Sequence, residues 1–237
     1  MHLSIVIPAY NEAERIGKTL EKYLNHFSRF TDKFEIVVVL NGCRDNTAEI
    51  VSKFVEQHLQ TVKMLNIPEL IGKGGAIRRG LSLAKGQAVG FVDADGATSP
   101  EEFEKLVANL KTYDAVIASR WKKGAKVYNR KISRKIISLI FAVLVKIIFW
   151  WRYYDTQCGA KVFNSSVIKK ILPRLRTNNM AIDVDILQQC RKMKYRVKEL
   201  PTIWVDQENS DFLSSPFRLL TQALAMVSSL IKIRFSN

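Results

Sequence analysis

Short apolar runs alternate with amphipathic segments along the first half of the chain. Five runs rich in β-branched residues predict buried parallel strands, and they cover residues 3–8, 34–40, 62–67, 88–92 and 115–119. The segments between them predict helices over residues 13–26, 46–59, 75–84 and 100–111. Strands that alternate with helices favour an α/β fold with a mostly parallel central sheet. Because such sheets bind ligands beyond the carboxyl ends of their strands, we expect the chemistry there.

Two later segments follow another pattern, in which a long apolar run carries one polar stripe. Residues 136–151 are apolar except at Ser138 and Lys146. As a helix this run would be about 24 Å long, shorter than the ~30 Å hydrocarbon core of a bilayer, so it predicts no membrane span. We expect amphipathic helices at about 131–151 and over 216–235 to lie in a membrane interface. The alternative is that both pack on the protein core.

The composition gives the chain a strong positive charge. Its 37 lysines and arginines outnumber 22 acidic residues, for a formal net charge of +15. Residues 115–154 carry many of these cations and no acid, on both sides of the first apolar run. The pattern predicts an anionic membrane surface as a partner. It argues against a nucleic acid, because the cations lie beside aliphatic runs rather than exposed aromatic side chains.

The start of the chain and its cysteines bear on location. The first residues lead directly into a predicted strand, without the apolar core of a signal peptide. Three widely spaced cysteines, Cys43, Cys158 and Cys190, predict neither a disulfide framework nor a zinc cluster. We therefore expect a peripheral protein at the cytoplasmic face of a membrane.

Polar residues follow the first two predicted strands. The first strand ends in Pro8, and Tyr10 and Glu12 come directly after it. This rigid turn displays an aromatic ring and polar groups that suit a nucleoside. The second strand is followed by Asn41 and further polar residues.

Cations follow the third and fifth strands. Residues 72–75 form a glycine-rich turn that contains Lys73, and Arg79 lies a few positions later. Glycines allow a close backbone approach and the lysine supplies a charge for a phosphate, although glycine–lysine turns are also common in plain loops. Arg120 follows the fifth strand, and its cation could also face phosphates.

Two carboxylates follow the fourth strand. Asp93 and Asp95 stand two positions apart after a buried apolar run, so they point the same way and repel each other unless a cation lies between them. Hard oxygen ligands at this spacing suit Mg²⁺ or Mn²⁺, which usually also bind diphosphate oxygens and water. The alternative is a solvated loop that contains two acids.

Seven motifs in order resemble those of a known family. They are IVIPAYNE, the glycine turn at 72–75, FVDADGAT, ASR, DTQCGAKVF, AIDVDIL and IWVDQENSDF. Together they are similar to glycosyltransferase family 2, which has the Rossmann-like GT-A fold, and in particular to polyprenyl (dolichyl) phosphate hexose synthases. The resemblance covers nearly the whole chain. It implies a GT-A catalytic domain over residues 1–212, with a membrane-associating amphipathic helix over 213–237.

The resemblance implies an inverting transfer of a hexose from a nucleoside diphosphate sugar to a lipid acceptor such as polyprenyl phosphate. Asp95 would bind the metal that bridges the donor phosphates, with Asp93 beside it. The leaving diphosphate develops charge, which the metal and nearby cations can stabilise. The cations implied are Lys73, Arg79 and Arg120. The residues implied for the nucleoside are Pro8, Tyr10, Glu12 and Asn41.

The sugar and acceptor side is also implied by the resemblance. Asp155 and Gln157 would line it, with Ser210 in the turn of a later motif. Asp183 occupies the position of the general base in relatives with hydroxyl acceptors. A lipid phosphate is already anionic and needs no base, whereas a lipid hydroxyl needs one. Asp183 and Asp185 could instead be acids that favour a helix N-terminus.

Two departures from the family pattern leave alternatives open. The second strand usually ends in paired aspartates, and here Asn41 and Gly42 stand instead. This narrowly favours GDP-mannose over UDP-glucose as the donor. Asp211 stands where the family commonly has a phosphate-binding lysine. The alternatives are transfer to a lipid hydroxyl with Asp183 as base, and an inactive protein that binds sugar nucleotides.

Overall fold

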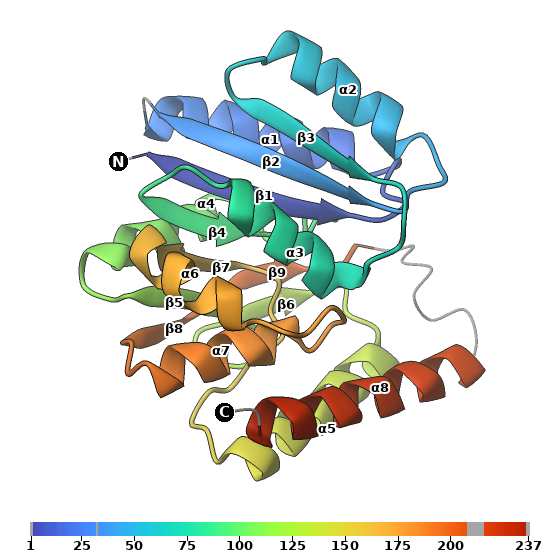
Figure 1. The fold of residues 1–237 in the computed structure, drawn as a ribbon, viewed down its shortest axis with the longest axis vertical. Coiled ribbons are helices and arrows are strands. Elements are labelled where there is room, and N and C mark those ends of the chain that lie inside the picture. The colour runs from blue at the N-terminus through green and yellow to red at the C-terminus, as the bar shows by residue number, and fades with distance from the viewer. Residues whose placement is uncertain (1, 32, 208–215, 236–237) are drawn as a thin grey trace.

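The computed structural model describes residues 2–31, 33–207 and 216–235, with the backbone alone at 134 and 216–224 (Figure 1). Its main sheet has seven strands in the order β3-β2-β1-β4-β7-β5-β8. They are β1 (Leu3–Ala9), β2 (Phe34–Asn41), β3 (Val62–Ile67), β4 (Ala88–Phe91), β5 (Ala115–Ser119), β7 (Lys161–Asn164) and β8 (Val197–Pro201). All neighbouring pairs are parallel except those that β7 makes with β4 and β5. The mostly parallel α/β sheet is confirmed.

Helices cover both faces of this sheet because its strands are apolar on both sides. In β1, Ile5 and Ile7 pack into one core with α1 (Ile16–Phe30) and α4 (Pro100–Ala108), and Val6 packs into the opposite core. That opposite core includes α3 (Gly72–Leu83), α6 (Ser165–Ile171) and α7 (Ile182–Lys192). The helix α2 (Thr47–Gln57) packs beside α1, next to β3 at the outer part of the sheet (Figure 1).

A second small sheet joins two segments beyond the main one. The strands β6 (Lys126–Tyr128) and β9 (Ile203–Val205) pair in parallel. The sequence predicted neither strand, because three residues give too short a pattern to identify one. This pairing places the segment that precedes α5 beside residues 203–205.

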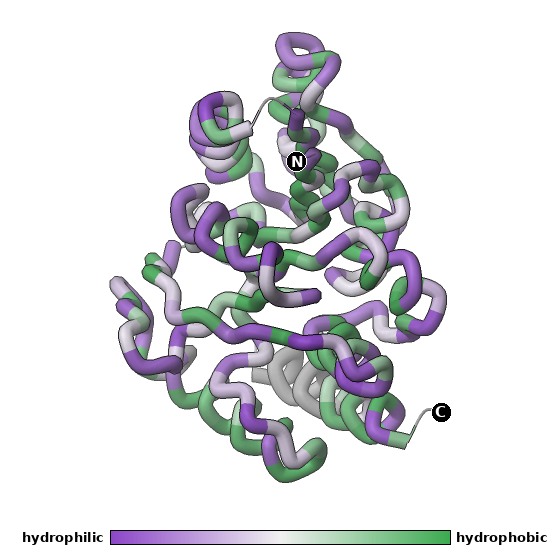
Figure 2. The backbone as a smooth tube through the Cα atoms, turned by 90° about the vertical axis from the view of Figure 1, so that its left-hand side faces the viewer, coloured by the Kyte–Doolittle hydropathy of each residue, from purple (hydrophilic) through white to green (hydrophobic). Residues whose placement is uncertain are grey.

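Two long helices form a layer of their own at one end of the molecule. They are α5 (Ile132–Phe149) and α8 (Pro216–Phe235), and they lie side by side beneath α7 (Figures 1 and 2). A third apolar core joins them to α7 and the sheet through Val145, Phe149, Leu187, Leu230 and Ile233. Both long helices therefore pack on the protein along one stripe, as the alternative interpretation expected.

The opposite stripe of α5 is apolar and exposed. Its large exposed side chains are Ile132, Ile136, Ile137, Leu139, Ile140, Val143 and Ile147, and Trp150 follows the helix. Trp150 is 85% exposed, whereas Val145 on the packed stripe is 1% exposed. None of the described helices is both long enough and apolar enough to cross a bilayer. The expected domain boundary at 212 and 213 lies outside the described residues.

Candidate functional site

The centre of the site is an ion pair between the end of β4 and the start of α3. Lys73 Nζ lies 2.6 Å from Asp93 Oδ1. Burial alone would raise the pKa of Asp93, but the Lys73 ammonium outweighs this effect and holds the pKa below its ordinary value. Burial opposes the charge of Lys73 as well, yet Asp93 raises the lysine pKa above its ordinary value. Both groups are therefore held in their charged forms.

Asp95 has a less favourable environment. Burial and the neighbouring charge of Asp93 raise its pKa above the ordinary value. Its Oδ1 accepts a hydrogen bond from the Ala97 backbone N–H at 2.9 Å. A partly buried carboxylate whose charge is disfavoured in this way suits an added cation.

Glu12, which follows β1, is a third acidic residue close enough to Asp93 and Asp95 to be affected by their charges. Burial, together with the charges of Asp95 and Asp93, raises its pKa to about 7 against the lowering effect of Arg15. Arg15 Nε donates to Glu12 Oε2 at 2.7 Å. Arg15 was not singled out in the sequence because it lies inside an ordinary amphipathic segment.

The end of β5 holds a second buried ion pair. The Arg120 guanidinium donates to both carboxylate oxygens of Asp155, at 2.7 and 3.0 Å. Burial alone would raise the pKa of Asp155, but Arg120 holds it below its ordinary value. The Asp155 and Tyr154 backbone N–H groups donate to Glu199 of β8, a positioning contact that the sequence did not reveal. Asp155 and Arg120 thus hold each other in a fixed, fork-shaped pair.

A third ion pair lies deeper, below these two. Lys161 Nζ of β7 donates to Asp183 Oδ1 of α7 at 2.5 Å and to the Cys158 carbonyl at 2.7 Å. Both side chains are almost wholly buried, and Asp183 Oδ2 has no hydrogen-bond partner among the described residues. Asp185, also in the first turn of α7, accepts from the Arg176 and Thr177 backbone N–H groups. The sequence missed Lys161 because nothing in its neighbours marks a lysine that is buried.

Two other predicted residues have clear positions. The Gln157 side-chain Nε2 is buried without a hydrogen-bond partner among the described residues, so it can donate to a ligand. Asn41 is buried, and its Oδ1 accepts from the Ile71 backbone N–H at 2.8 Å. Asn41 therefore holds the loop before α3.

The remaining predicted residues lie at or outside the edge of this cluster. Tyr10 is 45% exposed after β1, and Pro8 is partly buried within that strand. Arg79 is exposed on α3, six positions after Lys73 and therefore on another face of the helix. The structure does not bring Arg79 to the phosphate side predicted for it. Ser210 lies outside the described residues.

The glycine-rich turn has a different role from the one expected. Residues 72–75 form the first turn of α3, which begins three positions earlier than predicted. The Gly74 N–H donates to the Asn178 carbonyl at 2.8 Å, and a Cβ on Gly74 would lie 2.5 Å from the Thr177 carbonyl. These glycines thus allow the 177–179 loop to approach, and Lys73 alone points to the charged cluster.

Aromatic rings link this cluster to the segment that precedes α5. The guanidinium carbons of Arg120 and Arg130 lie 5.4 and 5.5 Å from the centre of the Trp204 ring. Arg130 also lies 5.2 Å from the Trp121 ring. Burial and the charge of Arg120 lower the pKa of Arg130 to about 10. The Trp204 indole thus holds a guanidinium from each of two segments, because cations are attracted to the electron-rich face of the ring.

The donor set fits a divalent ion that is shared with a ligand. No group of three or more metal-ligating side chains occurs in the part of the chain that the structure describes. Asp95 offers hard carboxylate oxygens whose charge is incompletely balanced, and the Lys73-paired carboxylate of Asp93 lies beside it. Mg²⁺ and Mn²⁺ are commonly held by one or two carboxylates together with phosphate oxygens and water. The remaining ligands would therefore come with the substrate.

A mostly parallel sheet with charged side chains at the ends of its strands is the fold of a glycosyltransferase, and a family match assigns the chain to that class. The model of the family described as "Glycosyl transferase family 2" matches residues 4–204, and the chain belongs to that family. The family resemblance, the GT-A fold and the enzyme class predicted from the sequence are thus confirmed.

Several relatives share one description, dolichyl-phosphate beta-glucosyltransferase. One from Trichomonas vaginalis is 33% identical over 86% of this chain and 64% of its own length. Those of Dictyostelium discoideum and Saccharomyces cerevisiae are 31% and 30% identical, each over 99% of this chain and 74% of the relative. The chain therefore spans about two thirds to three quarters of the length of these relatives.

Solved structures with low sequence identity share the fold. Glucosyl-3-phosphoglycerate synthase of Mycobacterium tuberculosis, in complex with Mn²⁺, UDP and phosphoglyceric acid, has a TM-score of 0.73 at 16% identity, over 99% of this chain and 78% of that one. A mannosyltransferase of Pyrobaculum calidifontis, in complex with GDP-Man and Mn²⁺, has a TM-score of 0.66 at 19% identity, over 98% and 64%.

Proposed function

We propose that the chain transfers glucose from UDP-glucose to a polyprenyl phosphate of the dolichyl type at an anionic membrane surface. The shared description of its relatives favours glucose, in place of the narrow preference for GDP-mannose that the sequence alone gave. The observation that carries the proposal is the incompletely balanced charge of Asp95, which lies partly buried beside the Asp93–Lys73 pair. A diphosphate–metal complex matches that arrangement of charges.

The donor would bind across the ends of β1 and β4. Tyr10 offers an exposed ring to a nucleoside, and Glu12 and Pro8 shape the turn around it. Asp95 and Asp93 would hold Mg²⁺ or Mn²⁺, which supplies positive charge to the donor phosphates when bound. The ion pair with Asp93 holds the Lys73 ammonium in place. The ammonium would therefore need no rearrangement to stabilise the charge that develops on the leaving group.

The acceptor phosphate would lie near Trp204. Arg120 and Arg130 bring two cations to this ring, and an anionic group near the ring would be attracted to both. The buried Gln157 amide donor and the Asp155 carboxylate line the neighbouring sugar side. These contacts suit a phosphate on a lipid that arrives from the direction of α5.

The position of Asp183 bears on the hydroxyl alternative. A general base must reach the proton that it removes. Asp183 is instead buried and bonded to Lys161, so it supports the floor of the site. A phosphate acceptor is anionic near neutral pH and needs no base, which agrees with this arrangement.

The exposed stripe of α5 would contact the membrane. Ile140, Ile147 and Trp150 are among its exposed apolar side chains, and the exposed Lys131 and Lys135 lie at the beginning of the helix. Apolar insertion with lysines over lipid phosphates suits an anionic bilayer, with about 1 kcal/mol for each nearby cation. The proposal therefore makes the protein peripheral to the membrane.

The test is a matched transfer assay in detergent. UDP-glucose, GDP-mannose and UDP-GlcNAc are each supplied with dolichyl phosphate or dolichol, in the presence of Mn²⁺ or Mg²⁺. We expect the highest turnover with UDP-glucose and dolichyl phosphate. Transfer to dolichol at an equal rate would favour the hydroxyl alternative, and nucleotide binding without any turnover would favour the inactive sugar-nucleotide-binding protein.

A further inference from the structure

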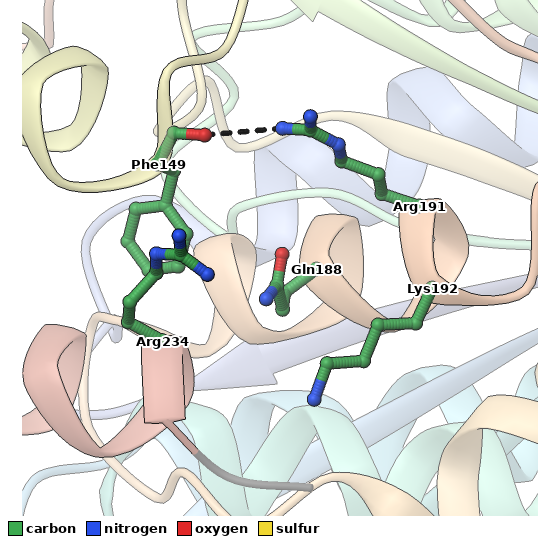
Figure 3. A pocket seen from close by; sticks show the side chains of 5 residues that line it. All are labelled: Phe149, Gln188, Arg191, Lys192 and Arg234. Carbon is green, nitrogen blue, oxygen red and sulfur yellow. Dashed lines mark hydrogen bonds between the residues drawn. The ribbon is translucent and has the colours of Figure 1, made fainter.

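A basic cavity lies at the far end of α7 from the catalytic residues. It has a volume of about 300 Å³ and is lined by Phe149, Gln188, Arg191, Lys192 and Arg234 (Figure 3). These residues come from the C-terminal ends of α5, α7 and α8. Three of these five lining residues are cationic and none is acidic.

Helix capping explains part of this arrangement. Arg191 donates to the Phe149 carbonyl and Arg234 Nε to the Ile148 carbonyl, each at 3.1 Å. Basic side chains favour helix C-termini because the terminal carbonyls carry partial negative charge. A neutral carbonyl uses one donor of each guanidinium, however, and each has five N–H groups. Capping therefore fixes the two arginines in place and leaves their charges to attract an anion.

The positions of the side chains suit a phosphate. Figure 3 shows the Gln188 amide between Arg234 and the two cations of α7. Guanidinium groups bind phosphate through paired hydrogen bonds, and a nearby amide can donate to a third oxygen. A volume of this size also accommodates an alcohol group attached to the phosphate.

The cavity adjoins the exposed apolar stripe. Trp150 directly follows Phe149, and the exposed Ile231 and Phe235 lie on either side of Arg234 in α8. A group that enters this cavity can therefore remain attached to chains that lie along the apolar surface. Basic pockets between helices next to a membrane surface bind lipid headgroups in this way.

We propose that this cavity binds the phosphate headgroup of an anionic phospholipid, separately from the acceptor lipid. The membrane as the source of the phosphate rests on the proposed function. The headgroup would join the ends of α5, α7 and α8, and so orient the catalytic domain on the bilayer. Asp183 and Arg191 lie eight residues apart in α7, about 12 Å along the helix, so the cavity is distinct from the catalytic cluster.

The first experiment measures binding of soluble probes by calorimetry. The probes are dihexanoyl phosphatidic acid, its zwitterionic phosphatidylcholine counterpart and inorganic phosphate. We expect phosphatidic acid to bind at least about tenfold more weakly to Arg191→Gln/Arg234→Gln than to the unaltered protein, because charged hydrogen bonds are lost. The matched control is Lys135→Gln/Lys146→Gln, which removes the same charge from exposed positions of α5 outside the cavity.

Several outcomes would overturn the proposal. Equal affinity in the cavity variant, or an equal loss in the control, would show that general charge attraction explains the binding. Inorganic phosphate that binds as tightly as phosphatidic acid would remove the lipid from the proposal. Absence of binding by the unaltered protein would end it.

A second measurement needs no variant and covers the case in which the arginine variants fail to fold. Phenylglyoxal modifies accessible arginines of the unaltered protein, and mass spectrometry gives the rate at each site. Phosphatidic acid should slow modification of Arg191 and Arg234 several-fold and leave the exposed Arg152 unchanged. Equal rates at the three arginines with and without lipid would contradict the proposal.

Transfer activity separates this inference from the proposed function. Arg191→Gln/Arg234→Gln should retain transfer to dolichyl phosphate in detergent, where orientation on a bilayer does not matter. Loss of that activity in a folded variant would contradict a separate site. If the unaltered protein bound phosphatidic acid in the cavity yet transferred no glucose, the proposed function would fail and the headgroup site would stand.

Discussion

Charged residues usually lie at the surface and large apolar residues in the core, and two regions depart from this rule in opposite ways. They are the strand ends and the exposed stripe of α5. At the strand ends, Asp93, Asp95 and Arg120 are charged groups that are only partly exposed to water, and burial opposes the charge of each. On α5, Ile140 and Trp150 are large apolar groups exposed to water. Each arrangement is unfavourable in the isolated protein, because burial disfavours charge and water disfavours apolar surface. Under the proposed function each region would gain from a different partner, a cation with a diphosphate at the strand ends and a lipid surface on α5.

The comparison predicts opposite responses to substitution in the two regions. At the strand ends, removing a charge should impair the reaction and leave the fold intact or more stable. On α5, removing apolar surface should impair membrane binding without lowering stability in solution. Between the two regions, the Lys161–Asp183 pair belongs to neither group, because its partners balance each other inside the protein.

The largest effect is expected from Asp95→Asn. This change keeps the shape of the side chain and removes the charge that would hold the metal. Transfer should fall by about 10³-fold, the upper range for loss of one transition-state contact. Unfolding in urea without ligands should require slightly more denaturant, because repulsion from Asp93 is relieved. Retained turnover would refute the metal role of Asp95.

Asp93→Asn is the matched control at the same strand end. It removes the partner of the Lys73 ammonium, which is held 2.6 Å away. This variant should lose both activity and stability, so the two carboxylates differ in the sign of their effect on folding. If both variants were equally destabilised, the contrast between a balanced and an unbalanced carboxylate would be wrong.

The next effect concerns the buried pair between the two regions. Lys161→Met leaves Asp183 charged and without a partner in the core, which should lower the free energy of unfolding by about 3–5 kcal/mol. Adding Asp183→Leu should restore most of that loss, since both charges are then absent. Urea unfolding of Lys161→Met, Asp183→Leu and the double variant measures the coupling between the two residues.

Activity in the same series tests the hydroxyl alternative. If Asp183 were a general base, Asp183→Asn would abolish transfer even when the protein remained folded. The pairing with Lys161 predicts instead that transfer follows the fraction of folded protein. A folded but inactive Asp183→Asn variant would contradict the structural role.

The sequence was sufficient for the parts of the fold that repeat a simple pattern. The strands β1 and β2 are long β-branched runs, and Ser99 with Pro100 marks the start of α4, where the Ser99 hydroxyl accepts from the Glu102 backbone N–H. The strand β7 was missed because it is four residues long, begins with Lys161 and runs against its neighbours. A buried lysine has no pattern of its own, since its partner lies on another element.

The same limit applies to the candidate site. Asp93, Asp95 and Lys73 could be predicted because they follow strands that end at one edge of the sheet. Glycine positions were harder to interpret: Gly74 accommodates the 177–179 loop, and Gly159 leaves space for the Asp93 carboxylate, which a Cβ would approach to 1.8 Å. These contacts join segments far apart in the chain, so no local signal could reveal them.

The predicted role of α5 in membrane binding is tested by substituting the exposed stripe and the packed stripe separately. Ile140→Ser/Ile147→Ser/Trp150→Ser should weaken binding to anionic vesicles by about 100-fold, from roughly 1 kcal/mol of lost apolar contact at each partly exposed position. Val145→Ser, on the packed stripe of the same helix, should instead lower the melting temperature. Sedimentation with liposomes and thermal unfolding measure the two effects. Unchanged sedimentation of the triple variant would remove α5 from the membrane interface.

The smallest effect is a pH dependence at the strand ends. Burial raises the pKa of Glu12 from its ordinary value of 4.5 to about 7 in the folded protein. The folded state therefore holds a proton that the unfolded state releases between these two values, and stability falls as pH rises from about 4.5 to about 7. The loss should be roughly 1–2 kcal/mol, reduced from the full shift by partial solvent exposure.

Glu12→Gln separates this effect from other titrating groups. The variant should match the unaltered protein near pH 4.5 and unfold at higher urea concentration near pH 8, because it carries no charge beside Asp95 and Asp93. Added Mn²⁺ and UDP should reduce the difference, since a bound cation makes the Glu12 carboxylate easier to ionise. If the free energy of unfolding changed with pH in the same way for both proteins from pH 4.5 to 8, the charges of Asp93 and Asp95 would not affect Glu12. The contrast between the two regions would then rest on Asp95 alone.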